Sequence, residues 1–500
     1  MKLCFFMQRR FALIAHSLAC SIYHKHPTAK FCGFVQTRRS FDFLNQQKEI
    51  SYTQLVLEED VLRNYKDEII DWAFLKQLEK DYGIPYLWPH IEVDRIIRHG
   101  QHVRQYPHDT PKYSHEEMLQ ILQRTAKAVL KFLDEEKPDV LIFSIVCSLS
   151  SYLLYSIAKK RNIPIQIITL TRIGTKHSIT DDYKTLSDVD EFFEKIKNRG
   201  MDFPKEREEA EKFLQRFRKS PFPYTLGESP NTRAINRKRQ FSFLLPRNFW
   251  RSIQWLFVST YQYLAGAERG DYSTITPWHF FIDKIRQKVR VFIGFDDLYD
   301  TLTLDQNFVF YPLQLEPENS TALFAPFYTD QLWLARQIAK SLPIDYVLCV
   351  KEHPTMYGKR SRRYYKELKK IPNVRLLSPT VVSYDLIARA KLIITISSSV
   401  GWEALLFKKP VITFGDVPYN KLSMARKCIA PEFLAETIKE HLATFIHNER
   451  ELTDYLTAVF KASVDVDLVQ IWDIEGGSTL KKRAHELEPL ADLIAQKAYL

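Results

Sequence analysis

The sequence reads KEHP at residues 351–354, SSSVGWEAL at 397–405 and KPVITFG at 409–415. These segments follow or contain short apolar runs at 346–350, 392–396 and 411–414, which are rich in branched residues and alternate with polar, helix-starting stretches. Such alternation is typical of βαβ units with parallel strands. Because open α/β sheets bind ligands at the carboxyl ends of their strands, we expect a lysine, a histidine, three serines and a glutamate to gather there. The simplest ligand for that edge is a nucleotide phosphate with its ribose.

The rest of the chain extends this α/β pattern into two halves. The 500 residues, 45% of them hydrophobic, are enough for about two to three domains. In the first half the pattern predicts strands at 3–7, 31–35, 139–145 and 163–170, and helices at 11–23, 115–136 and 148–161. The second half opens with a strand at 307–313 and continues through four further strand–helix steps, and a helical tail follows at 480–500. We therefore predict two Rossmann-like domains facing one another across a cleft, with a C-terminal helix returning to the first domain, as in the GT-B architecture.

These elements predict four parts of the chain. Residues 1–204 form an N-terminal Rossmann-like domain, and residues 205–290 form a basic, aromatic, helical linker or membrane-interface segment. Residues 291–476 form a C-terminal Rossmann-like domain, and residues 477–500 form the returning helix.

Positive charge is concentrated in one strip of the sequence. Of the net charge of +11, residues 212–251 supply +9, from ten basic residues against the single acidic Glu228. The strip leads into an amphipathic helix expected at 249–266, with Trp250, Phe257 and Tyr261 at helical spacing. One interpretation is an interfacial element that meets anionic lipid or an anionic glycan, and the other is a solvated linker whose aromatic helix packs between domains. Nucleic acid is disfavoured as a partner, because no recognition module accompanies the strip.

Cysteine usage and hydropathy bear on the cellular compartment. The six cysteines (Cys4, Cys20, Cys32, Cys147, Cys349 and Cys428) have no regular spacing, which is typical of reduced thiols in a cytoplasmic protein. Residues 1–10 are too short in apolar length for a signal peptide and predict a buried first strand. No run of about 18 apolar residues predicts a membrane-spanning helix.

Two of the residues expected to bind the nucleotide follow the strand that ends at 350. Pro354 fixes the backbone after His353 and delays the next helix, so the imidazole is held at the sheet edge. There His353, with Lys351 two residues earlier, can bind a phosphate oxygen and stabilise a leaving nucleotide. The alternative is a structural histidine in a strand-to-loop turn.

The serine cluster predicts the rest of this nucleotide site. One of Ser397, Ser398 and Ser399 is expected to cap the following helix, worth about 1 kcal/mol. The remaining hydroxyls, the first backbone N–H groups and a close approach at Gly401 would cradle a phosphate at the positive helix end without a divalent metal. Glu403, one turn into that helix, is either placed to complement the helix dipole or available for ribose hydroxyls. Trp402 and Leu405 are expected in the core.

The motifs QLEPENS at 314–320, KEHP, residues 397–406, Lys409-Pro410, Phe414-Gly415 and Pro418-Tyr419 occur in an order that resembles the bacterial capsule polysaccharide biosynthesis family. That family includes the Kdo transferases that build the lipid-linked capsule primer. The resemblance covers 312–419, whereas the first 200 residues agree only in fold pattern. It implies a glycosyltransferase with a CMP-activated sugar acid, typically Kdo, as donor and a lipid- or glycan-linked acceptor in capsule polysaccharide or lipopolysaccharide synthesis. It further implies a peripheral location at the inner membrane face and no cofactor, since the CMP-sugar is a substrate.

The resemblance also suggests site roles, with the acceptor on the domain at 1–204 and the nucleotide-sugar donor on the domain at 291–476. Gln314 is expected to bind the donor, and Glu403 takes the place of a glutamate that bonds ribose hydroxyls. The Kdo transferases have an acidic pair near Glu316 and Glu318, where a carboxylate attacks the anomeric carbon or acts as a base. This chain has a glutamate at 318, and its carboxylate lies one methylene further from the backbone than in that pattern. Arg172 and His177, beyond the last expected strand of the first domain, are candidates for an anionic acceptor or the carboxylate of a sugar acid.

Three other functions fit parts of this pattern. A polyol-phosphate transferase of the teichoic acid type also uses His-Pro and hydroxyl motifs to hold a CDP-alcohol. A sugar-nucleotide 2-epimerase shares the fold but does not require the basic aromatic strip. A non-catalytic capsule assembly or export factor with a vestigial nucleotide site belongs to a different class.

Overall fold

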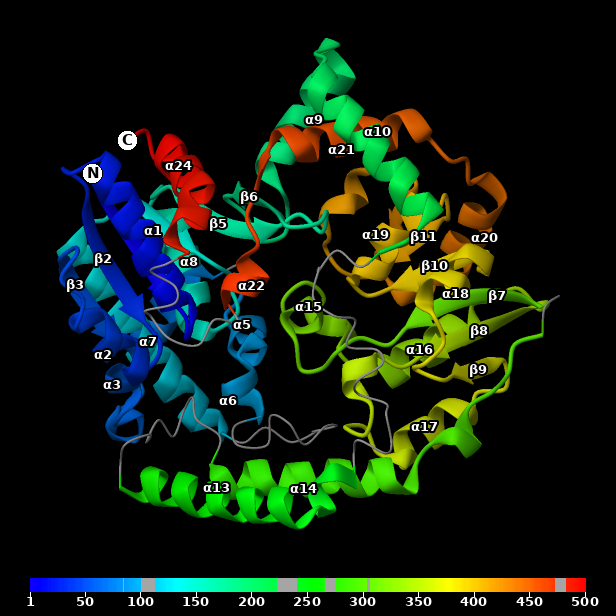
Figure 1. Ribbon diagram of the computed structural model, residues 1–500, viewed down its shortest axis with the longest axis horizontal. Helices are drawn as coiled ribbons and strands as arrows, with labels where there is room; N and C mark the ends of the chain where they lie inside the picture. Colours follow the sequence, from blue (N-terminus) through cyan, green and yellow to red (C-terminus); the bar gives the residue numbers. More distant parts are fainter. Residues whose placement is uncertain (84, 100–112, 223–240, 266–275, 304–305, 473–482) are drawn as a thin grey trace.

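The computed structural model describes residues 1–500 except 84, 100–112, 223–240, 266–275, 304–305 and 473–482 (Figure 1). Its first sheet has seven strands in the order β13-β6-β5-β4-β1-β2-β3. All neighbours pair in parallel except β5 with β6 and β6 with β13, which are antiparallel. The strands are β1 (Lys2–Met7), β2 (Lys30–Val35), β3 (Tyr52–Leu57), β4 (Val140–Phe143), β5 (Ile165–Leu170), β6 (Lys176–Thr180) and β13 (Ser463–Asp465).

The second sheet has six strands in the order β12-β11-β10-β7-β8-β9, and every neighbouring pair is parallel. This is the arrangement that the alternating apolar runs predict. The strands are β7 (Asn307–Pro312), β8 (Tyr346–Lys351), β9 (Val374–Leu377), β10 (Leu392–Thr395), β11 (Val411–Thr413) and β12 (Ala425–Lys427).

Helices cover both sheets, and several begin with the caps that their sequences encode. Ser114 and Glu117 form a capping box at the start of α7, where Ser114 Oγ accepts from Glu117 N at 3.2 Å and the Glu117 carboxylate accepts from Ser114 N at 2.9 Å. The helices of the first half are α1 (Phe11–Lys25), α2 (Arg38–Asn45), α3 (Glu58–Leu62), α4 (Trp72–Tyr82), α5 (Trp88–Val93), α6 (Arg95–His99), α7 (His115–Glu136), α8 (Leu149–Lys160), α9 (Ser187–Arg199) and α10 (Pro204–Lys219). Those that follow are α13 (Pro246–Leu264), α14 (Pro277–Ile293), α15 (Asn319–Ala322), α16 (Gln331–Lys340), α17 (Arg362–Lys369), α18 (Ser383–Arg389), α19 (Ser399–Leu406), α20 (Leu434–Thr444), α21 (Glu449–Lys461), α22 (Leu468–Trp472) and α24 (Glu488–Lys497).

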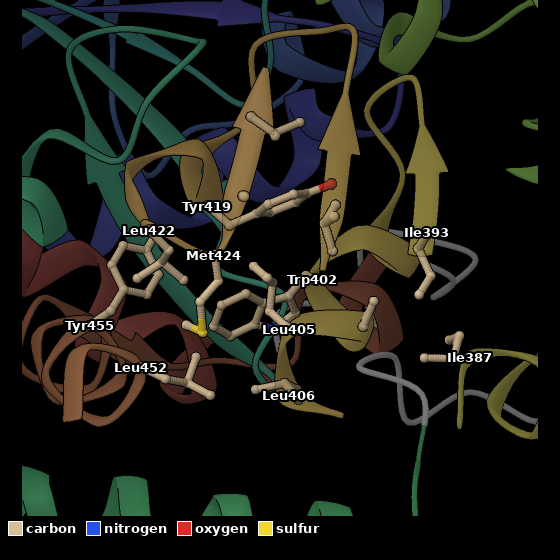
Figure 2. Close-up of a cluster of buried hydrophobic side chains, with 14 of the residues drawn as sticks. Ile387, Ile393, Trp402, Leu405, Leu406, Tyr419, Leu422, Met424, Leu452 and Tyr455 are labelled. Carbon is tan, nitrogen blue, oxygen red and sulfur yellow. The ribbon is translucent and has the colours of Figure 1, made fainter. Parts of the chain in front are cut away.

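Each sheet is buried on both faces, because alternate residues of its strands enter different cores. Phe5 of β1 lies in one cluster with α1, whereas its neighbour Phe6 lies in another with α7 and α8. In the second sheet, Phe308 belongs to the core that also holds Trp402 and Tyr419 (Figure 2), and Val309 belongs to the core of the opposite face. Burial on both faces explains the continuous apolar runs in the sequence.

Each sheet and the helices that cover it form one body of the molecule, and the first body holds the N-terminus. The chain crosses between these two bodies more often than a simple division into two domains requires. Helices α9 and α10 pack with α21 in the core of the second body, although the sequence places the end of the first domain at residue 204. Strand β13 then returns to the edge of the first sheet, and α24 packs on α1 beside the N-terminus (Figure 1). The expected return of the C-terminal helix is confirmed, with Leu490 and Ile494 buried in the first body.

Helices α13 and α14 form an antiparallel hairpin along the lower edge of the molecule in Figure 1. Ring contacts join them, with centroids 5.2 Å apart for Trp255 and Phe280 and for Tyr263 and Trp278. The helix expected at 249–266 is therefore present, but no residue of α13 is buried, so it does not pack between the two bodies. The basic residues Arg233, Arg237, Lys238 and Arg239 lie outside the described residues.

In the described ranges, no helix has both the length and the apolar content to cross a membrane. All six cysteines are free thiols, as their spacing predicts.

Candidate functional site

The residues expected to bind the donor gather where the strands of the second sheet end, and we call this carboxyl edge the donor edge. The central strand β7 has β10 on one side and β8 on the other, so the three loops that follow these strands are neighbours. The register pairs Pro312 with Lys351, and therefore the loops with Gln314 and His353 leave the sheet at the same level. The serine cluster follows β10 and continues directly into α19.

Lys351 and Glu403 form the charged centre of this edge. Lys351 is 5% exposed, and its Nζ donates to Ser383 Oγ at 2.9 Å. Burial lowers the pKa of Lys351 to about 8, although the nearby carboxylates of Glu352 and Glu403 oppose this shift. Burial likewise raises the pKa of Glu403 to about 7, against the opposing effects of Arg172, Lys351 and a hydrogen bond from Tyr384. A carboxylate and an ammonium group at one sheet edge can bind the hydroxyl and phosphate groups of a polar ligand.

His353 is half-buried and has a structural role at the end of β8. Its side chain caps the short 3₁₀-helix Pro354–Met356, with Nδ1 accepting from Thr355 N at 3.3 Å and contacting Thr355 Oγ1 at 2.7 Å. Since Nδ1 accepts a backbone hydrogen bond, the ring proton is assigned to Nε2. Burial lowers the pKa of His353 to about 4, so the ring is neutral near pH 7. A neutral imidazole in this tautomer offers one N–H donor to a phosphate oxygen.

The three serines have different environments. Ser398 is the N-cap of α19, because its hydroxyl oxygen accepts from Val400 N at 3.0 Å. Gly401 N donates to the carbonyl of Ser398 at 3.3 Å, so two of the first backbone N–H groups are already bonded within the helix start. Ser397 is fully buried, whereas Ser399 is half-buried at the first helical position. Of the three hydroxyls, that of Ser399 is therefore best placed for a ligand.

Gly401 is explained by packing. A Cβ added at residue 401 would lie 2.4 Å from the Tyr419 hydroxyl oxygen and 2.9 Å from Tyr419 Cζ. That hydroxyl donates to the carbonyl of Ser398 at 2.7 Å, which ties the loop after β11 to the start of α19. Trp402 and Leu405 lie in the core as expected (Figure 2). The missing side chain thus makes room for a tyrosine, where the sequence suggested room for a phosphate.

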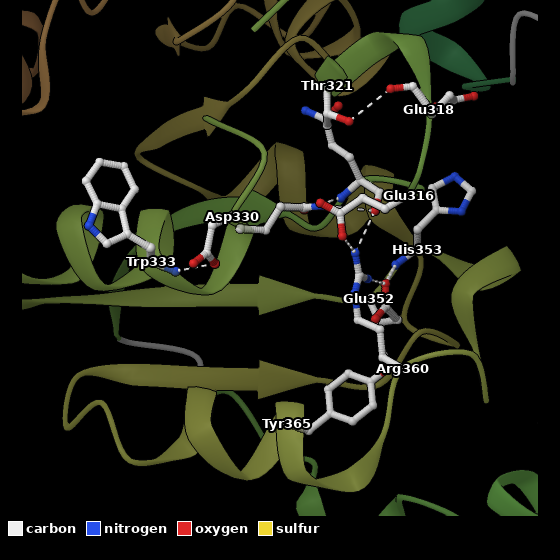
Figure 3. Close-up of polar contacts among 11 residues, drawn as sticks. Glu316, Glu318, Thr321, Asp330, Trp333, Glu352, His353, Arg360 and Tyr365 are labelled. Carbon is white, nitrogen blue, oxygen red and sulfur yellow. Dashed lines mark hydrogen bonds and ion pairs between the residues drawn. The ribbon is translucent and has the colours of Figure 1, made fainter. Parts of the chain in front are cut away.

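A buried ion-pair network lies beneath these loops (Figure 3). Arg360 is fully buried and pairs with Glu316 at 2.8 Å and with Glu352, while its Nη2 also donates to the carbonyl of Gln314 at 2.9 Å. Tyr365 donates to Glu352 at 2.7 Å. Removing one member would leave a charged partner uncompensated in a buried place, so the network fixes the backbone that presents His353.

Gln314 and Glu316 therefore have partners that hold the fold. The Gln314 amide, oriented so that both of its ends are satisfied, accepts from Ser397 N at 2.9 Å and from Ile396 N at 3.1 Å. It links the end of β7 to the end of β10. Glu316 is 6% exposed and paired with Arg360, whereas Glu318, two residues later, is exposed. Of the two candidate catalytic carboxylates, only Glu318 lies at the surface of this edge.

The first body contributes Arg172. Its Nη2 donates to the carbonyl of Ser397 at 3.4 Å, and its positive charge opposes the raised pKa of Glu403. Arg172 has φ +65°, a left-handed conformation that costs an ordinary residue about 1–3 kcal/mol and is found at functional sites. His177 has a different environment: it is buried in β6, and its Nδ1 bonds to the carbonyl of Thr175 at 2.9 Å. The structure thus brings Arg172 to the donor edge and holds His177 within the first sheet.

Sequence reasoning assigned no role to Arg360, Ser383 or Tyr384. A buried arginine looks like any surface arginine in a sequence, and RRYY at 362–365 gives no hint that the preceding basic residue is interior. Tyr384 carries no motif, and α18 brings it to Glu403 only through the fold of the sheet.

Comparisons with known proteins agree with the motif order. The family model described as capsule polysaccharide biosynthesis protein matches residues 281–450. Protein FixF of Sinorhizobium fredii is 31% identical over 129 residues, which are 24% of this chain and 30% of FixF, so the match spans less than a third of that protein.

Solved structures with a similar arrangement include the KpsC β-Kdo 2,7 transferase of Thermosulfurimonas dismutans, with 14% identity, a TM-score of 0.34 and coverage of 76% of this chain and 90% of that one. The KpsC β-Kdo 2,4 transferase of the same organism has 14% identity and a TM-score of 0.36, covering 65% and 80%. The UDP-GlcNAc 2-epimerase of Neisseria meningitidis has 12% identity and a TM-score of 0.23, covering 92% and 98%.

The matched segment contains the whole second sheet and the second-body residues of the donor edge. Residues 281–450 of this chain, which hold this sheet, are therefore similar to the capsule polysaccharide biosynthesis family.

Proposed function

We propose that this protein is a GT-B glycosyltransferase of surface polysaccharide synthesis. In this proposal it moves a sugar acid, Kdo, from a CMP-activated donor to a lipid- or glycan-linked acceptor. The bond between the anomeric carbon and the phosphate oxygen breaks, CMP leaves, and an acceptor hydroxyl loses its proton and forms the new bond. The family match over residues 281–450 supports a role in capsule synthesis.

The observation that carries the proposal is the convergence of Lys351, His353 and Glu403 with Arg172 of the first body. A nucleotide-activated sugar acid has matching groups: a ribose diol, a phosphate and a carboxylate. Glu403 in its ionised form accepts from ribose hydroxyls, and the cationic Lys351 and the Nε2–H of His353 bind phosphate oxygens. Arg172 is available for the carboxylate of the sugar acid, because a guanidinium binds carboxylates in a fork.

The catalytic carboxylate in this proposal is Glu318. It is exposed in the loop after β7, near the loop that carries His353 (Figure 3). A carboxylate there can attack the anomeric carbon or accept the proton of the acceptor hydroxyl. The phosphate charge that develops on CMP is stabilised by Lys351 and His353, so the proposed reaction proceeds without a divalent metal or cofactor.

The test is to incubate the purified protein with CMP-Kdo and to measure CMP release, with and without chelator. We expect CMP to accumulate and Glu318→Gln to suppress the release. Parallel incubations contain a CDP-alcohol or UDP-GlcNAc in place of CMP-Kdo. Release of CMP from the CDP-alcohol alone would favour the polyol-phosphate transferase, and conversion of UDP-GlcNAc alone would favour an epimerase. If the protein binds CMP but turns over none of these donors, the non-catalytic assembly or export role becomes the better explanation.

A further inference from the structure

The α13–α14 hairpin exposes more large apolar side chains than a solvated element needs. On α13, Trp250, Phe257, Tyr261 and Leu264 are 68%, 73%, 73% and 60% exposed. Their spacing of seven, four and three residues places them in one stripe along the helix. The half-buried residues Ser252, Leu256, Ser259 and Tyr263 lie on the opposite side, where α13 packs. The stripe is therefore a face of α13 that nothing in the described residues covers.

Helix α14 has a second exposed stripe. Trp278, Ile282, Ile285, Val289 and Phe292 are between 38% and 69% exposed and recur at alternating intervals of four and three residues. That interval keeps an apolar face on one side of a helix over its full length. Exposed large apolar side chains in such number on two adjacent helices mark an interaction site.

The charges of the hairpin identify the partner. α13 carries Arg247 and Arg251 and no acidic residue, and α14 carries four basic residues against Asp283. On a helical projection, Arg247 and Arg251 flank the stripe of α13, and Arg286 and Lys288 flank that of α14. Basic residues beside tryptophan, phenylalanine and aliphatic side chains are typical of helices that lie in the interface of an anionic bilayer. A protein partner of the same shape would not need this excess of positive charge.

The last turns of α14 are anchored to the second body. Val291 is buried, Gln287 Nε2 donates to the carbonyl of Tyr357 at 3.3 Å, and Arg290 donates to the carbonyl of Lys359. These contacts join the last turns of α14 to the segment that follows His353 and Pro354. A surface bound by the hairpin is thus held in a fixed relation to the donor edge.

We infer that the α13–α14 hairpin is a membrane-docking element that lies in the headgroup region of an anionic lipid surface. This inference deepens the proposed function, because a docked enzyme would face a lipid-linked acceptor, and in that respect alone it rests on the proposed function. Docking itself requires no turnover. Its test therefore gives a result whether or not the transferase proposal holds.

The test compares sedimentation of the full-length protein with vesicles of phosphatidylcholine alone and of phosphatidylcholine mixed with phosphatidylglycerol. We expect roughly tenfold more protein to sediment with the anionic vesicles, and the difference to fade as salt rises. The variant Trp250→Gln/Phe257→Gln/Tyr261→Gln should lose this binding, and Arg247→Glu/Arg251→Glu should lose the preference for anionic lipid. A matched control, Ile344→Ser/Ile429→Ser/Ile446→Ser, removes three side chains that are at least 82% exposed on the second body and should bind as the parent does.

Thermal unfolding and CMP affinity should be the same in the parent and in the hairpin variants, because the replaced side chains are exposed and lie outside the donor edge. Equal sedimentation with both vesicle types, or retention of binding in the aromatic variant, would overturn the inference. So would a dimer in light scattering that the aromatic variant converts to a monomer, since a second copy would then cover the hairpin. CMP release from CMP-Kdo without vesicle binding would remove the docking inference alone.

Discussion

At the carboxyl edge of the second sheet, Glu403 retains its proton at a pH where an exposed glutamate is ionised. Burial raises its pKa to about 7 and lowers that of Lys351 to about 8. Ribose binding requires the ionised glutamate, and phosphate binding requires the cationic lysine. The two proposed roles are therefore fulfilled together only in a narrow pH window.

The first prediction is a bell-shaped pH dependence of CMP affinity, measured by calorimetry. Affinity should rise as pH increases through about 7, where Glu403 loses its proton, and fall above about 8, where Lys351 becomes neutral. Glu403→Gln should abolish the rising limb and weaken binding roughly tenfold or more, the scale of a lost hydrogen bond to a charged group. Cytidine, which has no phosphate, should show the rising limb without the falling one. An unchanged acidic limb in Glu403→Gln would remove this glutamate from the ribose site.

The second prediction separates Glu318 from Glu316. Glu318→Gln should keep CMP affinity and stability but lower turnover roughly a hundredfold or more, as expected when a positioned acid–base or nucleophilic group is lost. Glu316→Gln should instead lower the free energy of unfolding by roughly 1.5–3 kcal/mol, because the buried Arg360 loses a charged partner. Urea unfolding and CMP release distinguish the two variants. A Glu318→Gln enzyme with activity within a few-fold of the parent would exclude Glu318 from catalysis.

At the scale of elements, α24 stabilises a body to which it is remote in sequence. Leu490 and Ile494 are buried against α1, and Gln166 Nε2 of β5 donates to the carbonyl of Ile494 at 3.2 Å. The third prediction is that Leu490→Ala lowers the free energy of unfolding by about 2–5 kcal/mol. The exposed Gln496→Ala on the same helix should change it little. Hydrogen exchange should report the loss in β1 and β5 and leave β7 and β8 protected, and a loss confined to the second sheet would contradict this packing.

Local sequence patterns predicted those elements whose order and caps are encoded nearby. The helix expected at 115–136 agrees with α7 at both ends, since the capping box of Ser114 and Glu117 fixes its start. The central strands of both sheets were found because burial on both faces makes them apolar throughout. Strands β6 and β13 were not, because their antiparallel pairing joins residues nearly 300 positions apart and their sequences are mixed.

Those residues of the candidate site that follow the central strands could be predicted from the strand pattern, whereas contacts between residues distant in sequence could not. The order of β7, β8 and β10 brings Lys351, His353 and Glu403 to one edge, as parallel topology requires. The interior status of Glu316 was not predictable, because it depends on Arg360, which lies 44 residues away and carries no local signal of burial. Gly401 illustrates the same point, since its neighbour Tyr419 is 21 residues from Ser398, to which the tyrosine hydroxyl donates.

At the scale of the whole molecule, polar contacts join the two bodies around the donor edge. Arg172 donates to the carbonyl of Ser397, and Lys184 pairs with Asp416 at 3.2 Å. The fourth prediction is that Arg172→Ala raises the KM for CMP-Kdo roughly tenfold or more and changes CMP affinity less, because the guanidinium is assigned to the sugar carboxylate. Lys184→Ala, which removes a cross-body ion pair of partly exposed groups, should have little effect. Equal losses of CMP and CMP-Kdo binding in Arg172→Ala would assign the arginine to the nucleotide.

The late return of the chain to the first sheet has a consequence for biosynthesis. Strand β13 pairs with β6, and α24 covers α1, so both contacts require residues that are synthesised after those of the second sheet. On the ribosome, a nascent chain that has emerged as far as α10 still exposes the apolar side of α1 and an open edge of β6. N-terminal domains commonly fold first during translation. Here the first sheet is completed only once residues 463–497 have emerged, and a nascent chain that ends at α10 would meet cellular chaperones with that surface uncovered.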